Sequence, residues 1–457
     1  MYRHVPNYQL TVARRAFAAA IVLTWVTGLA NTPWATAAPT ESTERPAPQP
    51  LTQSELGELT LRDALALALA RNPELAAFSQ ELRATEGAVL QAGVLPNPIL
   101  EIGRDNLSNV RKTEAGDRTT SLQLGQLIEL GGKRAARVRL AETGRDLANW
   151  DYETKRIAIL SQVAQRLVDV LASQSRKSLA EETVTLTQQV ADAAAKRVLA
   201  GKVSPVEETK ARLALASAEV EFEQAKRELI STRQALGALW GEPNPRFDKA
   251  IGDLAQTVTL PAYEKLAERV RNNPELARWS TELARRQAGV EAERAKAVPD
   301  ITLSAGTTRF SQFDDRAYMV GISIPIPLFD RNRGGILEAN RRLDKASDEQ
   351  RAVETRLTTE LGQSYQRLAA VDKEIQILRT TLLPGAQGAF DAAIQGYKLG
   401  KFGFLDVLDA QRTLFHARSQ NLRALTDYQR GVIEIERLIG GPLNAPLAPS
   451  SQKVVQQ

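Results

Sequence analysis

Two long stretches of this chain place apolar residues at alternating spacings of three and four positions. In the first stretch the stripe comprises Leu160, Val163, Leu167 and Val170, and in the second it comprises Leu357, Leu361, Leu368, Ile375, Leu378 and Leu382. Sustained spacing of this kind is typical of helices that pack as coiled coils. No proline interrupts 133–204 or 328–383, and a helix over 133–199 would be roughly 100 Å long. The pattern therefore predicts a rod or a tube.

A second pattern, with a period of two, precedes each helical stretch. Its clearest case runs over 318–328, where the apolar positions are Tyr318, Val320, Ile322, Ile324, Ile326 and Leu328. Weaker examples contain Ile301 and Leu303, Leu100 and Ile102, and Leu122 and Leu124. Such segments fit transmembrane β-strands with one apolar face, and we expect Val320, Ile322, Ile324 and Ile326 to face lipid. Soluble hairpins packed on the helices would show the same alternation.

The same order of elements occurs twice along the chain. Asn72-Pro73-Glu74-Leu75 recurs 201 residues later as Asn273-Pro274-Glu275-Leu276, and Gly201-Lys202 recurs 199 residues later as Gly400-Lys401. These shifts far exceed the repeat length of solenoid proteins. We expect two large repeats, each with a first helix (59–94 and 261–297), a β-hairpin and a long helical hairpin. The predicted boundaries are 59–240 for the first repeat, 241–260 for a linker, 261–440 for the second repeat and 441–457 for a tail.

The first residues have the pattern of an export signal. Three arginines precede an apolar stretch, Ala16 to Ala30, and Ala35-Thr36-Ala37 resembles a cleavage site. We therefore expect a signal peptide over 1–37, followed by a proline-containing flexible leader over 38–58. Cleavage would lower the formal charge from +5 to +2, so the basic pI does not argue for nucleic acid. No other apolar run is long enough to span a membrane as a helix.

The composition excludes several kinds of chemistry. The chain has no cysteine, so disulfides, redox thiols and a cysteine-linked lipid are excluded. After signal removal His416 and Met319 are the only residues of their types, which leaves too few ligands for a soft-metal site. His416 lies in a helical run and no serine nucleophile motif is present. Gly131-Gly132-Lys133 lacks the spacing of a P-loop. We expect neither an enzyme nor a cofactor.

Counting strands predicts an oligomer. Two repeats with two strands each supply four strands per chain, whereas closed membrane barrels use about eight or more. Four strands cannot close a barrel, so the barrel would have to be shared between chains.

With these features the chain resembles the TolC family of outer-membrane efflux ducts. The resemblance rests on the repeated Asn-Pro-Glu-Leu, on the segment from Ile324 to Arg331, and on the segment from Gly396 to Gln411. Ile128-Glu129-Leu130-Gly131-Gly132-Lys133-Arg134 looks like the heavy-metal branch (CzcC-like), whose members are outer-membrane partners of cobalt–zinc–cadmium exporters.

The resemblance implies an α+β membrane protein that forms a homotrimer. Four strands from each chain would build a shared barrel of twelve strands in the outer membrane, and the helices would continue it as a coiled-coil tunnel in the periplasm. The implied partners are an inner-membrane pump of the resistance–nodulation–division (RND) type and a periplasmic adaptor, also called a membrane fusion protein. The chain would be the passive exit duct for substrates, expected to be divalent heavy-metal cations.

The resemblance also suggests roles for the ends of the helical hairpins. The turns at 200–206 and 399–405 would be periplasmic tips that dock the adaptor, with Gly201, Val206, Glu207, Gly400, Leu405 and Asp406 as the docking residues. Asp192 and Asp391, at matching positions before the tip glycines, would form a periplasmic gate. The alternatives are that the tip residues only cap helices and that each aspartate lies on a solvated face.

Two other functions remain open at this point. A type I secretion duct, which exports proteins, would share the fold. A periplasmic coiled-coil scaffold, such as the adaptor itself, would share the long helices, although it would need an additional domain of short strands that the sequence does not show.

Overall fold

The structure is a computed structural model, and the residues that it describes are 57–105, 118–310 and 314–443. All of them belong to the unit Ser54–Gln457. The predicted signal peptide, nearly all of the predicted leader, and the part of the predicted tail beyond residue 443 lie outside the described residues.

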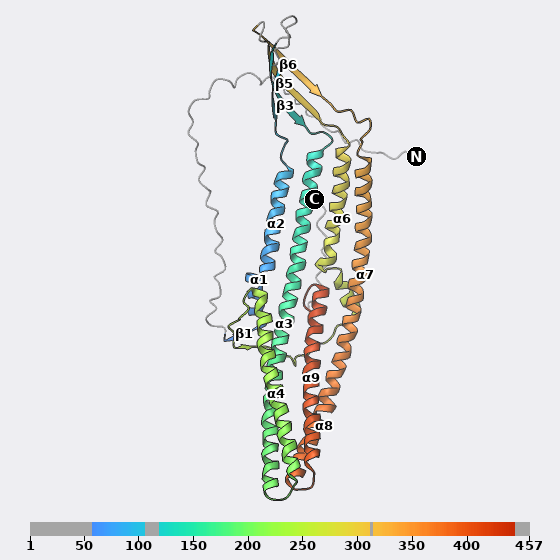
Figure 1. Ribbon diagram of the computed structural model, residues 1–457. Coiled ribbons are helices and arrows are strands. Elements are labelled where there is room, and N and C mark those ends of the chain that lie inside the picture. Colours follow the sequence, from blue (N-terminus) through green and yellow to red (C-terminus); the bar gives the residue numbers. More distant parts are fainter. Residues whose placement is uncertain (1–56, 106–117, 311–313, 444–457) are drawn as a thin grey trace, which may run out of the picture. The chain divides into compact units, whose positions relative to one another are not determined.

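Each half of the described chain contains two shorter helices, a β-hairpin and a long helical hairpin (Figure 1). The first half comprises α1 (Leu61–Arg71), α2 (Pro73–Ala92), β2 (Ile99–Asp105), β3 (Thr119–Ile128), α3 (Lys133–Leu199) and α4 (Pro205–Gly237). The second half comprises α5 (Tyr263–Val270), α6 (Pro274–Lys296), β5 (Ile301–Phe310), β6 (Asp315–Ser323), α7 (Arg333–Ile377), α8 (Leu383–Lys398) and α9 (Phe404–Ile439).

The first helix predicted for each repeat is divided into two by an asparagine that precedes a proline. Asn72 and Asn273 have extended backbones with ψ of 123° and 128°, because a residue before proline avoids the helical region. Each side chain caps the following helix, accepting the N–H of Leu75 and of Glu275 respectively. The prediction of one unbroken helix per repeat was therefore wrong, and the reason lies in the Asn-Pro pair.

The same two asparagines close each half of the chain upon itself. The Asn72 side-chain amide donates to the carbonyl of Leu239 at 2.7 Å, just after α4. The Asn273 amide donates to the carbonyl of Leu438 at 2.9 Å, in the last turn of α9. Both asparagines are buried, with 5 % of their surface exposed. The start of each half is thus held to the end of its own last helix.

The long helices follow the apolar stripes closely. Helix α3 has 67 residues, which corresponds to a length of about 100 Å, and it buries Val163, Leu167 and Val170. In the second half Leu357, Leu361, Leu368, Ile375 and Leu378 are buried, whereas Leu382 is 38 % exposed. Among the described residues, no helix is long and apolar enough to cross a membrane.

The long helix of the second half contains an irregular turn that the first half lacks. Residues Leu378–Leu382 form a π-helical segment between α7 and α8, and the N–H of Leu383 bonds to the carbonyl of Leu378. Pro384 follows immediately. A proline inside a helix has no N–H and clashes with the carbonyl four residues earlier, so the wider turn accommodates it.

The two β-hairpins form a single antiparallel sheet with the strand order β2-β3-β5-β6. The central pairing joins the two halves of the chain, and it runs from Thr119 opposite Phe310 to Ile128 opposite Ile301. Strands β2 and β6 are the edges and have no further partner within the described residues. In Figure 1 the sheet lies at one end of the helices and the two glycine turns lie at the other end.

Strand β6 is shorter than its apolar alternation predicted. It ends at Ser323, so Ile324 and Ile326 lie beyond the strand, and the expectation that they belong to it was wrong. Pro325 and Pro327 explain the early end, because proline cannot donate to a β-ladder.

The predicted linker also contains ordered structure. Strand β4 (Lys249–Ala250) pairs in parallel with β1 (Glu58–Leu59), so the last residue of the predicted leader, Glu58, belongs to a strand. Gln174 of α3 bonds both backbone groups of Ala250, and the Tyr428 hydroxyl of α9 bonds both backbone groups of Val258. The linker is therefore attached to the long helices of both halves.

Candidate functional site

The two helical hairpins reverse direction at glycines with left-handed backbones. Gly201 has φ of 68° and Gly400 has φ of 74°, a conformation that other residues adopt at a cost. The N–H of Lys202 bonds to the carbonyl of Arg197 at 2.9 Å, and the N–H of Lys401 bonds to that of Gly396 at 2.8 Å. Both turns therefore have the closure that commonly ends a helix at glycine, as the sequence predicted.

The first turn of each returning helix exposes an aliphatic side chain. Val206 is 58 % exposed and Leu405 is 59 % exposed, and the two residues occupy equivalent positions in the repeat. Asp406 has a defined structural role, because its carboxylate accepts the N–H of Gly403 at 2.8 Å and so caps α9. The two tips thus share one exposed aliphatic group in the first turn of the returning helix.

Glu207 differs from the other tip residues because it points into the molecule. Its Oε2 atom is buried and has no hydrogen-bond partner among the described residues, and the same is true of the Tyr397 hydroxyl. Burial raises the pKa of Tyr397, and the nearby Glu207 carboxylate adds to this effect. The Glu207 carboxylate therefore lies at the contact between the two hairpins, whereas the Val206 side chain is exposed.

Arg197 joins the two hairpins close to the tips. Its guanidinium lies over the Tyr397 ring, 4.3 Å from the ring centre, and its Nη1 donates to the Tyr397 carbonyl at 3.1 Å. Arg197 occupies the repeat position at which the second half has Gly396. A Cβ atom on Gly396 would overlap the ring of Phe402. This position therefore holds a side chain that contacts the other hairpin in the first half, and a glycine that makes room for Phe402 in the second half. The comparison of the two repeats contained this signal, and the sequence analysis missed it.

Asp192 and Asp391 are both exposed and have matching surroundings. Gln188 donates to Asp192 at 2.9 Å, and Gln387 donates to Asp391 at 3.0 Å. Each aspartate is therefore bonded within its own helix, and no hydrogen bond or ion pair connects the two among the residues that the structure describes. Within the described part of the chain, no group of three or more histidine, aspartate or glutamate side chains is arranged to hold a metal ion.

The four-stranded sheet has one apolar face. Cross-strand partners share a face, and one row runs through Leu100, Leu124, Ala305 and Val320. A neighbouring row runs through Gln126, Leu303 and Ile322. Val320 is 87 % exposed and Ile322 is 68 % exposed. The opposite face has small and polar residues, with one row through Glu101, Gln123, Gly306 and Met319.

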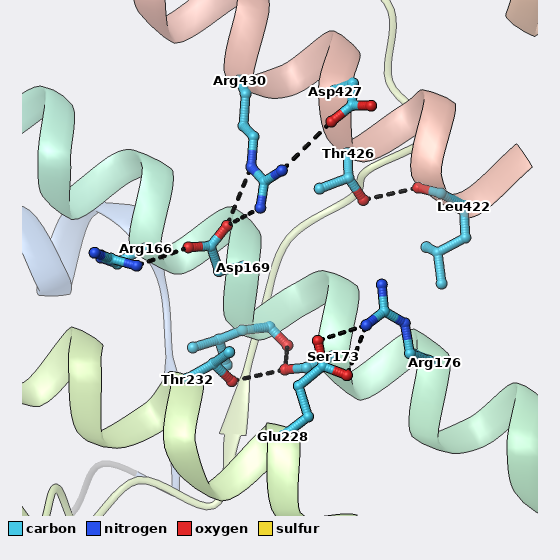
Figure 2. A network of polar contacts seen from close by, with 11 residues as sticks. Arg166, Asp169, Ser173, Arg176, Glu228, Thr232, Leu422, Thr426, Asp427 and Arg430 are labelled. Atoms are coloured by element: carbon cyan, nitrogen blue, oxygen red, sulfur yellow. Dashed lines mark hydrogen bonds and ion pairs between the residues drawn. The ribbon is translucent and has the colours of Figure 1, made fainter. Parts of the chain in front are cut away.

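A polar network joins α3 to α4 and to α9 (Figure 2). The Asp169 carboxylate of α3 accepts a hydrogen bond from Arg430 of α9 at 2.6 Å, and the Asp169 side chain is only 16 % exposed. Nearby, Arg176 and Ser173 of α3 contact Glu228 and Thr232 of α4 at 2.6 and 2.8 Å. The first contact connects the two halves, and the others connect the helices of one hairpin. Sequence patterns do not show such pairs, because their partners are far apart along the chain.

Comparison with known proteins agrees with this arrangement. Residues 64–242 and 266–441 match the model of the family described as outer membrane efflux protein. The chain is 43 % identical to the cobalt-zinc-cadmium resistance protein CzcC of Cupriavidus metallidurans, over 84 % of this chain and 90 % of that protein. It is 26 % identical to the nickel-cobalt-cadmium resistance protein NccC of Alcaligenes xylosoxydans xylosoxydans, over 67 % of this chain and 69 % of that protein.

Solved structures show the same fold at lower identity. A crystal structure of CusC aligns with a TM-score of 0.73 and 20 % identity, covering 83 % of this chain and 92 % of that one. The outer membrane protein VceC of Vibrio cholerae aligns with a TM-score of 0.70 and 19 % identity, covering 84 % and 97 %. The predicted family and its heavy-metal branch are confirmed: this chain belongs to the outer membrane efflux protein family.

Proposed function

We propose that three copies of this chain form an outer-membrane duct. The observation that supports this most directly is the open sheet, whose edge strands β2 and β6 have no partner within the described chain. Unpaired edges and an exposed apolar face are both unfavourable in water. Pairing β6 of one copy with β2 of the next would close a barrel of twelve strands with its apolar face toward lipid.

In this proposal the helical hairpins continue the barrel as a tunnel in the periplasm. The tips with Gly201, Val206, Gly400 and Leu405 dock the periplasmic adaptor, and Asp406 supports the second tip by capping α9. Glu207 is assigned to the contact between hairpins because its carboxylate is partly buried. The domain boundaries predicted above, including the signal peptide, are part of the same proposal.

Asp192 and Asp391 are proposed to narrow the tunnel near its periplasmic end. Both are exposed, and three copies would place six carboxylates at a similar height in the tunnel. Like charges repel one another and attract cations. Such an arrangement would favour an open tunnel and admit cations more readily than anions.

The proposed substrates are divalent heavy-metal cations. The support comes from the 43 % identity to a cobalt-zinc-cadmium resistance protein and from the further match to a nickel-cobalt-cadmium resistance protein. A passive duct does not require a high-affinity site for its cargo. An RND-type pump in the inner membrane, linked through the adaptor, would supply the energy for transport.

The proposal is tested by assembly, conductance and metal tolerance together. We expect a trimer in detergent, single-channel current in planar bilayers, and restored tolerance of cobalt, zinc or cadmium when the gene is returned to a deletion strain. A water-soluble monomer would overturn the duct and favour the periplasmic scaffold. A conducting trimer with unchanged metal tolerance in the deletion strain would favour a type I secretion duct.

The docking role is tested by Leu405→Glu, which places a charge at the exposed tip. We expect export to be lost while the trimer and its conductance remain. The matched control is Val220→Glu on α4, because Val220 is similarly exposed at 57 % but lies about four helical turns from the tip. Metal tolerance equal to that of the wild type in Leu405→Glu would refute docking at this tip.

A further inference from the structure

The segment that follows β6 exposes a continuous series of large apolar side chains. Ile324, Ile326 and Leu328 are 52 %, 77 % and 65 % exposed, and Phe329 is 99 % exposed. They follow directly from Val320 and Ile322 on the apolar face of the sheet. The apolar stripe therefore extends past the end of the β-ladder, into a segment with a different backbone structure.

Contacts of its own hold this segment in place. The N–H of Leu328 bonds to the carbonyl of Ile326 at 2.9 Å, and Arg331 Nε donates to the carbonyl of Pro327 at 3.2 Å. Asn332 has a left-handed backbone with φ of 52°, and its side chain donates to the carbonyl and the carboxylate of Glu293 on α6 at 2.8 and 2.7 Å. Phe329 is thus exposed on a turn that hydrogen bonds hold in place.

Two arginines at the end of the segment have guanidinium N–H groups that make no hydrogen bond with the described residues. Arg331 uses only its Nε atom, and Arg333 makes no hydrogen bond or ion pair with the described residues, although both are exposed. Two other cations near the same end of the helices are paired, since Lys133 contacts Asp300 at 2.7 Å and Arg137 contacts Glu129 at 2.6 Å. Guanidinium groups bind phosphate through two parallel hydrogen bonds.

Neither water nor hydrocarbon suits this combination of groups. In hydrocarbon the backbone N–H groups of Ile324 and Ile326, which lie outside the ladder, would lack partners at a high energetic cost. In water a 99 % exposed phenylalanine beside three other exposed aliphatic side chains would be unfavourable. The headgroup region of a bilayer suits both the backbone N–H groups and the apolar side chains, because it offers water and polar groups together with the start of the acyl chains.

We propose that residues 324–333 form an interfacial anchor that binds the phosphate-bearing headgroups of phospholipids. Phe329, Ile326 and Leu328 insert between the headgroups, while Arg331 and Arg333 bind lipid phosphate. Because the segment connects the sheet to the helices, the phospholipids concerned belong to the periplasmic leaflet. The proposal rests on the placement of the sheet in the membrane, and it identifies a lipid partner for a segment outside that sheet.

The depth of the segment is measured with tryptophan probes in the full-length trimer. Phe329→Trp and Val320→Trp are each placed in vesicles of phosphatidylethanolamine and phosphatidylglycerol in which part of the lipid carries bromine at one known depth. The wild type supplies the signal of the native tryptophans. We expect Phe329→Trp to be quenched best by bromine close to the headgroup and Val320→Trp by bromine deeper in the acyl chain.

The two probes separate this proposal from the proposed function. Quenching of Val320→Trp without any quenching of Phe329→Trp would overturn the anchor; if iodide also fails to quench Phe329→Trp, the residue packs on a neighbouring copy. Absence of lipid quenching at Val320→Trp as well would instead contradict the membrane placement of the sheet.

The arginines are tested by the preference for anionic lipid. Spin-labelled phosphatidylglycerol and phosphatidylcholine report how strongly each lipid associates with the reconstituted trimer. A basic residue beside an anionic surface contributes roughly a fivefold preference, so the variant with Arg331→Gln and Arg333→Gln should lose most of the preference for phosphatidylglycerol. The control carries Arg341→Gln and Arg351→Gln, because these arginines lie further along α7 and pair with Asp344 and Asp348. Equal preference in both double variants would overturn the role of Arg331 and Arg333.

Discussion

At the scale of single residues, the two repeats are most alike where the backbone leaves little choice. Gly201 and Gly400 have the same left-handed conformation, and Asn72 and Asn273 make equivalent caps. The repeats differ at the contact between the two hairpins, where the first half has Arg197 and the second has Gly396. Matching residues thus maintain the fold of each half, and the differing residues shape the contact between the two hairpins.

Replacing a tip glycine should destabilise the hairpin. Gly400 has φ of 74°, and a side chain there costs about 1–2 kcal/mol. We expect Gly400→Ala to lower the temperature of thermal unfolding measured by circular dichroism at 222 nm. The matched control is Gly388→Ala in α8, where a Cβ atom meets no neighbour within 4 Å and alanine favours the helix by up to about 1 kcal/mol. An equal change in both variants would contradict the role assigned to the Gly400 backbone.

At the scale of elements, one carboxylate links the sheet to the long helix of the other half. Asp300 precedes β5, and its Oδ1 accepts both the Leu130 N–H at 3.0 Å and Lys133 Nζ at 2.7 Å. Partial burial opposes ionisation of Asp300, but the hydrogen bond from Lys133 and that from Leu130 outweigh it and lower the pKa of this carboxyl. The pair therefore attaches the start of α3 to the strand of the other half.

Acidification should weaken this attachment. A carboxyl with a lowered pKa stabilises the folded state fully above its unfolded value, about 3.9, and loses that contribution as the pH falls through the lower folded value. We expect Asp300→Asn to lower the unfolding temperature at neutral pH and to have a progressively smaller effect as the pH falls below the unfolded value. The check is a series of thermal unfolding curves across this range, with Asp344→Asn as an exposed control. A difference from wild type that stays constant with pH would refute the mechanism.

The elements also show what the sequence could and could not predict. The spacing of Leu357, Leu361 and Leu368 predicted a long helix because burial on one side repeats with the helical period. The pairing of β3 with β5 left no comparable signal, because the ladder is formed by backbone groups that every residue possesses. The contact between Asp169 and Arg430 was likewise invisible, since charged residues occur on solvated faces throughout the chain. The Asn-Pro breaks were visible and were overlooked.

At the scale of the whole molecule, the sheet offers two surfaces of opposite character, and adjacent residues of β6 distinguish them. Val320 lies on the apolar face and Met319 on the face with small and polar residues. In the proposed duct these faces contact lipid and lumen respectively. Neighbouring residues of the strand therefore face different environments.

A charge on the lipid face should impair assembly, and the same charge on the lumen face should not. Arginine facing the middle of a bilayer costs about 2–4 kcal/mol, whereas lumen residues mainly affect conduction. We expect Val320→Arg to reduce the amount of trimer in the outer-membrane fraction. Met319→Arg should assemble normally and change single-channel conductance. Normal assembly of Val320→Arg would show that this face does not meet lipid.

The covalent connection between the two halves has a consequence for the stoichiometry of the assembly. Asn72 and Asn273 each hold the start of one half to the end of the same half, and residues 241–260 join the two halves in one chain. The connection at 241–260 fixes the ratio of the two tips in any assembly, because every chain contributes one tip of each kind. However many chains assemble, the tip with Val206 and the tip with Leu405 are present in equal numbers.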